Sequence, residues 1–389
     1  MPLRSLAAGA LFLLQAGLCL ATGPSRSGIV LSPVYTIDRK WGSMQGPRST
    51  QPLTLWTAGG PELLWITGVR AEIVGADGAS PMPVELFCHI NLDLDLDIHR
   101  GLFRWTKTGR PRLLSLSQGQ TGLRLPDGFG IPIYSDEPLT LTTQVLNHNL
   151  ERPNLRVRHR ITIDFRRDAE LAAPLRPLFT TMGYVLVVLK GSEGYPGIPS
   201  PEEEVHGEAC LPGRVAPNAF TRVNYSDAFG REFTGHWVVP PGGETRHTNV
   251  TALLGLPFDT TLHFAAIHLH PFAESLELRD LTAGETVFRA IARSPARGIG
   301  LEHVDVFSSA AGVPLYKGHQ YQLVSVYRKP PPGETDAMAA AFLMLLDREF
   351  AHPARAGPGP VACAADDAAP AALRRQLPQE SPGADPFPR

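Results

Sequence analysis

The chain has 389 residues, which is enough for two domains or for one large domain. Its 36 basic and 38 acidic side chains give a formal net charge of −2, so the composition offers no overall basic field that would attract nucleic acid. With 37 glycines, 37 prolines and little helical periodicity, the sequence favours many short strands joined by turns.

The N-terminus, residues 1–22, is predicted to be a secretory signal peptide. Arg4 supplies a positive end, Leu6 to Leu20 forms an apolar core, and small residues follow. The alternative is a membrane anchor, but the apolar run is short for a membrane span, which needs about 20 residues. No later stretch is long and apolar enough to cross a bilayer. We therefore expect a secreted or extracytoplasmic protein with a cleaved signal peptide and no stable membrane insertion.

Residues 23–174 are predicted to form a first β-sandwich domain, because β-like runs alternate with turns. The runs are residues 63–74, 84–94, 139–146 and 155–165. In the last run polar and apolar residues alternate with the period of two that is typical of a strand with one solvated face. His159 falls on its apolar side and is expected to be a hydrogen-bonded core histidine. Residues 174–177 are expected to be a linker.

Residues 178–352 are predicted to form a second β-sandwich domain. Its expected strands are residues 236–239, 262–268, 275–278, 321–327 and 340–346. From residue 353 to residue 389 the composition collapses to mainly alanine, proline, glycine and aspartate, and this tail is expected to be disordered because it cannot bury a core. The pattern as a whole predicts an all-β fold of two tandem antiparallel β-sandwich domains.

The second block contains a candidate metal site. His268 and His270 are separated by one residue in an apolar run, so both imidazoles lie on the same face of one strand. Met338 stands at the start of a later expected strand, just after a polar turn. Two imidazole nitrogens with a thioether sulfur suit copper better than zinc, calcium or magnesium. The alternative for Met338 is a core methionine, which is common.

The first block contains a second candidate set. Cys88 and His89 lie in one apolar run and His148 ends another. Cys88 and His89 face opposite ways in a regular strand, unless a bulge turns them together. The alternative is a packed cysteine beside a hydrogen-bonded histidine. After loss of Cys19 with the signal peptide, Cys88, Cys210 and Cys363 are an odd set, so at least one is expected to be a thiol, a ligand, or paired with another chain.

The order of these motifs (Cys-His, Gln-Val-x-x-His, His-x-His and a late Met) resembles the copper type II, ascorbate-dependent monooxygenases. That family includes peptidylglycine alpha-hydroxylating monooxygenase and dopamine beta-monooxygenase. The resemblance covers most of residues 60–348, including the turn at residues 317–320 and the Thr335–Met338 segment before an apolar strand. It implies two jelly-roll domains that each hold one copper, the first with His89 and His148 and the second with His268, His270 and Met338.

Two departures from the family pattern bear on chemistry. The family has two adjacent histidines where this chain has Cys88 and His89, and a thiol could replace an imidazole on Cu(I) or leave the site weak or empty. The amidating members also hold a peptide carboxylate with an arginine, an asparagine and a tyrosine. Here the corresponding positions are Ala266, Ala340 and Phe342, which argues against a glycine-extended peptide as substrate.

The function implied by the resemblance is a secreted copper-dependent monooxygenase. A reductant, typically ascorbate, loads both coppers with electrons. The catalytic site of His268, His270 and Met338 uses oxygen to hydroxylate a C–H bond of a small-molecule or peptide substrate, and the copper near His89 and His148 stores the second electron. Two alternatives remain open: a non-catalytic secreted copper-binding or interaction protein that keeps the double jelly roll, and a cell-surface β-sandwich protein without copper.

Overall fold

The computed structural model describes residues 24–43, 45–55, 59–103, 111–188, 225–226, 231–328 and 336–353. The expected signal peptide, the expected tail beyond residue 353, and Cys19, Cys210 and Cys363 lie outside these ranges. In the part of the chain that the structure describes, no helix is both long and apolar enough to span a bilayer.

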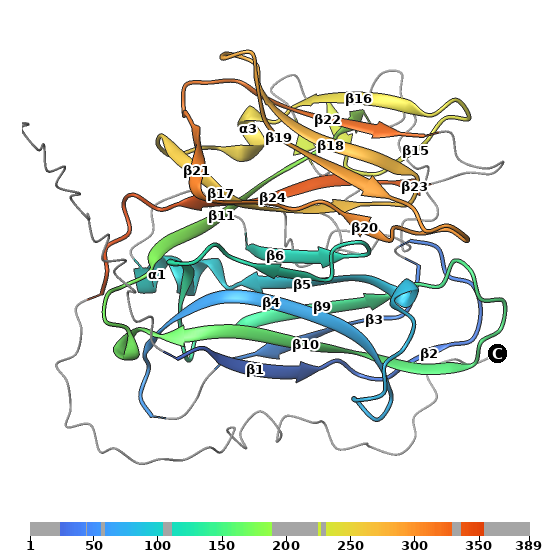
Figure 1. Cartoon of the computed structure of the whole chain (residues 1–389), viewed down its shortest axis with the longest axis horizontal. Helices are drawn as coiled ribbons and strands as arrows, with labels where there is room; N and C mark the ends of the chain where they lie inside the picture. Colours follow the sequence, from blue (N-terminus) through green and yellow to red (C-terminus); the bar gives the residue numbers. More distant parts are fainter. Residues whose placement is uncertain are drawn as a thin grey trace, which may run out of the picture.

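The first half of the chain forms two facing antiparallel sheets, which lie in the lower part of Figure 1. One sheet consists, in order, of β1 (Arg26–Leu31), β10 (Leu155–Arg167), β4 (Leu63–Gly75) and β8 (Phe129–Tyr134). The other consists of β3 (Arg48–Leu53), β9 (Leu139–Val145), β5 (Phe87–Leu94) and β6 (Arg112–Ser117).

The second half repeats this arrangement in the upper part of Figure 1. Its first sheet consists, in order, of β11 (Arg176–Tyr184), β24 (Ala339–Leu346), β17 (Thr260–Leu269) and β21 (Phe307–Leu315). Its second sheet consists of β16 (Glu244–Asn249), β22 (Tyr321–Tyr327), β18 (Ala273–Asp280), β19 (Glu285–Arg293) and β20 (His303–Val304).

Short elements connect these strands. They are β2 (Tyr35–Ile37), η1 (Val84–Leu86), α1 (Leu96–Phe103), β7 (Gly122–Arg124), η2 (Asp168–Glu170), β12 (Val187–Val188), β13 (Tyr225–Ser226), β14 (Glu232–Thr234), β15 (Trp237–Val238), α3 (Thr251–Leu254) and β23 (Asp336–Ala337).

The strand order identifies both halves as jelly rolls. When eight strands of each half are numbered along the chain, leaving out the two-residue strand β20, the two sheets have the orders 1-8-3-6 and 2-7-4-5 in both halves. This order arises when a long antiparallel hairpin wraps into two facing sheets. The prediction of an all-β fold with two tandem antiparallel jelly-roll sandwiches is therefore confirmed. The expected linker at residues 174–177 is shorter than predicted, because β11 already begins at Arg176.

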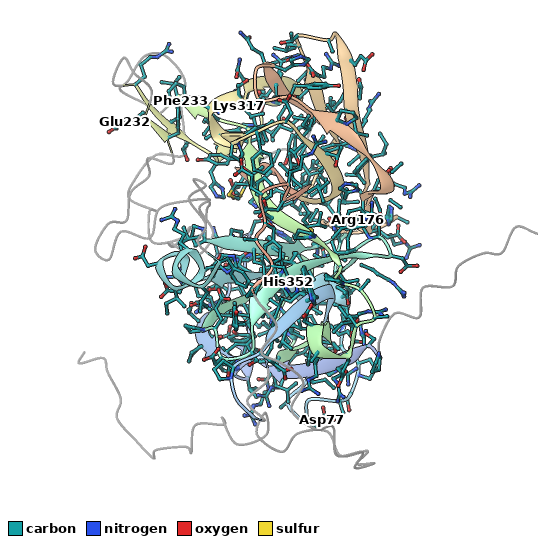
Figure 2. The ribbon with its side chains drawn as sticks, turned by 90° about the vertical axis from the view of Figure 1, so that its left-hand side faces the viewer. Asp77, Arg176, Glu232, Phe233, Lys317 and His352 are labelled. Atoms are coloured by element: carbon teal, nitrogen blue, oxygen red, sulfur yellow. The ribbon has the colours of Figure 1, made fainter. Side chains whose placement is uncertain are left out.

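The two sandwiches are packed against each other (Figures 1 and 2). In Figure 2, Asp77 lies in one sandwich, Lys317 in the other, and Arg176 and His352 at the level between them. The edge strands β8 and β11 pair in parallel over two residues, so one sheet continues from the first sandwich into the second. Buried apolar side chains of both halves belong to a single hydrophobic cluster, which favours one cooperative unit.

A three-residue turn after β6 holds the interface together. Gln118 Oε1 accepts a hydrogen bond from Leu301 N at 2.9 Å, and Gln120 Oε1 accepts one from Ile267 N at 2.7 Å. Between them, Gly119 O accepts from Val304 N at 2.9 Å. Gly119 has a positive φ of 85°, and a Cβ there would lie 2.8 Å from the Val304 side chain, so this position requires glycine.

His159 is buried in the core of the first sandwich and has 0% exposure. Its ring packs edge-on against Phe87 and Tyr35, with centroid distances of 5.2 and 6.1 Å. Neither ring nitrogen has a hydrogen bond of acceptable geometry among the described residues, so the expectation of a hydrogen-bonded core histidine is not met. Burial lowers the pKa of His159 to about 3, against an opposing contribution from the backbone of Gln144.

The buried neutral imidazole of His159 predicts acid sensitivity. Because an unfolded histidine has a pKa of about 6.5, the unfolded state binds more protons between pH ~6.5 and the folded pKa. Stability should therefore fall on acidification, with this residue contributing up to about 1.4 kcal/mol per pH unit. His159→Phe should reduce this slope in urea unfolding measured between pH 7 and 4.5. His247→Phe, at an exposed site, is the control. An unchanged slope in the His159 variant would contradict the assignment.

The turn at Gln120 gives a prediction for interface stability. Gln120→Ala leaves the buried Ile267 N–H without its acceptor, which should lower the free energy of unfolding by about 1–3 kcal/mol. Gln320→Ala removes an exposed amide and should have little effect. Equal denaturation midpoints for the two variants would show that the Gln120 contact does not hold the sandwiches together.

Candidate metal centre

His268, near the end of β17, and His270, directly after it, lie on one face, as the spacing predicted. Their ring centroids lie 5.4 Å apart, and their exposures are 7% and 3%. On the neighbouring strand, Ala340 pairs with His268, and Met338 O accepts a hydrogen bond from His270 N at 3.2 Å. Residues directly opposite each other in an antiparallel pair share a face, so this register places Met338 beside the two histidines. The three predicted residues of the second sandwich therefore come together.

Tyr327 supports the backbone at this position. Its buried hydroxyl donates to Met338 O at 2.6 Å and accepts from His270 N at 3.3 Å. Its ring packs edge-on against Trp237 at 5.6 Å. Burial raises the pKa of Tyr327 far above its ordinary value, so the hydroxyl keeps its proton and remains a donor. One side chain thus holds the ends of two strands that carry predicted site residues.

The structure adds two residues that the sequence analysis did not select, His236 and Asp336. His236 Nδ1 lies 3.3 Å from Asp336 Oδ1, and His270 Nδ1 lies 3.3 Å from Asp336 Oδ2. One ligand atom from each of the three residues can be chosen so that all lie within 4.8 Å of one another. Asp336 precedes Met338 by two, and strand periodicity alone would have placed it on the same face. No local pattern marked His236, which is close only because β15 pairs with β23.

Asp336 is the negative group of this cluster. Burial by itself would raise its pKa, but the neighbouring His236 and His270 more than offset this effect and hold the pKa of Asp336 well below its ordinary value. The carboxylate therefore stays ionised across the physiological pH range.

In the first sandwich, a β-bulge brings Cys88 and His89 to the same side. The pairing of β5 with β9 shifts between Phe87 and His89, which face Val145 and Gln144, so Cys88 is the extra residue. The Cys88 sulfur lies 3.2 Å from His89 Nδ1. Cys88 is a buried thiol that forms no disulfide with any described residue. The β-bulge, which the sequence analysis gave as one of two arrangements for Cys88 and His89, is therefore present.

The two predicted histidine sets meet at the interface between the sandwiches. The ring centroids of His89 and His268 are 6.2 Å apart, and the rings are nearly perpendicular. His148 is also near this cluster: burial and then the charge of His270 lower its pKa to about 4, and its Nε2 lies 3.4 Å from Ser43 Oγ. Residues predicted for two sites in separate domains, His89 from the first and His268 and His270 from the second, thus lie side by side at the interface.

Burial determines the protonation state of this cluster. The pKa of His89 is lowered well below its usual value, first by burial and then by Arg112. The pKa of His268 is lowered similarly, by burial and then by His270 and His89. Both imidazoles are therefore neutral at neutral pH and keep a lone pair that could bind a metal ion. Neither ring nitrogen of His268 has a hydrogen-bond partner among the described residues, an arrangement that costs free energy unless a ligand satisfies it.

Comparisons with known proteins add little beyond the fold. No protein-family model and no curated protein matches the chain. Among solved structures, the chain is similar to STIV MCP, at 7% identity over 82% of this chain and 97% of that chain, with a TM-score of 0.30. It is also similar to a peptide-N(4)-(N-acetyl-beta-D-glucosaminyl) asparagine amidase, at 8% identity over 84% and 98%, with a TM-score of 0.32. Fold and cluster together define an all-β, double jelly-roll protein with buried histidines at the interface.

The support from Tyr327 can be tested directly. Tyr327→Phe removes a buried hydroxyl that bonds to both Met338 and His270, and should lower the free energy of unfolding by about 1–2 kcal/mol. Tyr316→Phe is the matched control, because Tyr316 is 42% exposed. Chemical denaturation of both variants measures the difference. If the Tyr327 variant were as stable as wild type, the hydrogen bonds of the Tyr327 hydroxyl to Met338 and His270 would not contribute to the free energy of unfolding.

Proposed function

We propose that this chain is a secreted copper-dependent monooxygenase that hydroxylates a C–H bond of a substrate without a carboxylate, with molecular oxygen and a reductant such as ascorbate. The observation that carries the proposal is the meeting of the two histidine sets, with His89 and His268 6.2 Å apart across the interface. The motif order of the copper type II monooxygenases had assigned these two residues to two different coppers.

The residues of the cluster fit copper. His268 and His270, with Met338, would hold one ion, and His89 and His148, with Cys88, would hold another. Imidazole nitrogen with thioether or thiolate sulfur is a donor set that copper accepts in both oxidation states. Neither ring nitrogen of His268 has a hydrogen-bond partner among the described residues. This supports the fit, because a bound ion would give one of these nitrogens a partner. When bound, copper supplies one-electron redox chemistry.

The side chains around the cluster prepare it for this role. Burial between the sandwiches excludes water and keeps His89 and His268 neutral, so that no proton has to leave before a metal binds. The Cys88 sulfur lies beside His89 and offers a soft donor. Asp336 contributes a negative charge that offsets part of the charge of a bound cation.

The positions that would hold a substrate carboxylate in the amidating enzymes are apolar here. Ala266 pairs with Phe342, and Ala340 pairs with His268, on adjacent strands of the sheet that carries the histidines. All three side chains are buried, with exposures of 0–2%. None can donate a hydrogen bond to a carboxylate, which supports a substrate that lacks one.

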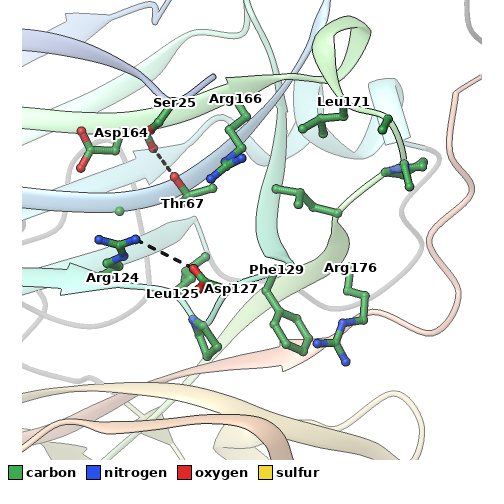
Figure 3. Close-up of a pocket in the computed structure, with 17 residues that line it drawn as sticks. Ser25, Thr67, Arg124, Leu125, Asp127, Phe129, Asp164, Arg166, Leu171 and Arg176 are labelled. Atoms are coloured by element: carbon green, nitrogen blue, oxygen red, sulfur yellow. Dashed lines mark hydrogen bonds and ion pairs between the residues drawn. The ribbon is translucent and has the colours of Figure 1, made fainter. Parts of the chain in front are cut away.

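A non-catalytic copper-binding protein is the second candidate, and the location of a pocket favours it. A pocket of about 890 Å³ lies at the junction of the sandwiches, and its lining includes Thr67, Phe129, Arg166 and Arg176 (Figure 3). None of the cluster histidines lines it. A copper ion held by the cluster would therefore not be exposed to this pocket, which fits a copper-binding protein without turnover.

Metal counting distinguishes these functions. The mature wild-type protein should contain two copper ions per chain and should consume oxygen when ascorbate is added. His270→Ala and His89→Ala should each lose one copper ion, with Cys88→Ser testing the third ligand of the first set. His247→Ala, at an exposed site, should keep both ions. Bound copper without oxygen uptake would support the binding protein, and a wild-type protein without copper would refute both.

A further inference from the structure

We infer that the metal ion of the second sandwich is bound by His236, His270 and Asp336, with His236 and the carboxylate taking the places that the motif order gave to His268 and the Met338 thioether. This inference rests on the proposed function only in that His270 belongs to both ligand sets. Two imidazoles and one carboxylate form a donor set for a divalent transition metal, and the carboxylate favours the +2 state over Cu(I).

The distances agree with a shared ion. Ligands bonded at about 2.1 Å to a tetrahedral centre lie about 3.4 Å from each other. The two nitrogen–oxygen separations at Asp336 are both 3.3 Å, one from each carboxylate oxygen. All three ligand atoms lie within 4.8 Å, so only a small closure would bring them to coordination distance.

A hydrogen bond does not account for the second of these contacts. His236 Nδ1 and Asp336 Oδ1 meet the geometry of a hydrogen bond. His270 Nδ1 and Asp336 Oδ2 form an equally close ion pair, but its geometry falls outside that of a hydrogen bond. Two buried polar atoms at this distance without a hydrogen bond leave a position that a cation would satisfy.

The surrounding structure holds the three residues in place. Trp237, next to His236, is fully buried, donates to Glu244 and packs on Tyr327. The pairing of Trp237 with Ala337 positions His236 relative to Asp336. His270 is held by the hydroxyl of Tyr327. The ligands come from three segments, but each is joined to the others by described contacts, as a metal site requires.

Cobalt provides a spectroscopic test. The full mature protein, freed of metal with a chelator, is titrated with Co(II), whose visible absorption reports its ligands. Wild type should bind one Co(II) through this set. Asp336→Asn and His236→Gln should lower the affinity tenfold or more and change the absorption bands. Met338→Leu should change neither, and Asp305→Asn, at a 38% exposed carboxylate, is the surface control. Circular dichroism verifies that each variant is folded.

The outcomes separate this inference from the proposed function. Unchanged bands in Asp336→Asn, or their loss in Met338→Leu, would overturn the carboxylate site. A modest drop in affinity with unchanged bands would assign Asp336 as an orienting hydrogen-bond acceptor and would also overturn it. Carboxylate-dependent cobalt binding without copper-dependent oxygen uptake would leave the site standing and refute the monooxygenase. Oxygen uptake that persists in Asp336→Asn would support the monooxygenase and would show that its activity does not need the Asp336 carboxylate as a ligand.

Discussion

The candidate metal centre depends on the packing of one sheet of the first sandwich against one sheet of the second. The sheet that contains β5 and the sheet that contains β17 face each other, and the Gln118–Gln120 turn makes three hydrogen bonds to the second sandwich, one to Ile267 in β17 and the others to Leu301 and Val304. Imidazoles buried between two apolar layers lose their hydration, and this loss lowers their pKa values. The same packing therefore brings the histidines together and keeps them neutral.

The electrostatics of the cluster follow from an imbalance between imidazoles and carboxylates. Two buried histidines, His236 and His270, face the two oxygens of Asp336, the one carboxylate found with them among the described residues. Charged imidazoles would repel each other across distances of 5.4 to 6.2 Å, and this repulsion adds to the effect of burial in lowering the pKa of His268. A metal cation can relieve this arrangement because it binds several neutral lone pairs at once. His159, by contrast, packs against the aromatic rings of Tyr35 and Phe87.

Strand periodicity explains what could be predicted. His268 and His270 share a face because they are two residues apart, and the turn before Met338 marks the start of a strand. The all-β class followed from short runs between turns. The linker predicted at residues 174–177 is shorter in the structure, because Arg176 and Pro177 already pair with β8. The parallel pairing of β8 with β11 joins the edges of the two sandwiches, and no local sequence pattern predicts it.

The sequence by itself determined the two β-sandwiches, the shared face of His268 and His270, and the position of Met338 directly before a later strand, since these depend on periods of a few residues. Only the tertiary structure decided that Cys88 lies in a bulge, that His89 meets His268, and that His236 and Asp336 join His270. The physical reason is that each of these contacts joins strands far apart in the chain, and their register is set by hydrogen bonding and sheet packing rather than by neighbouring residues.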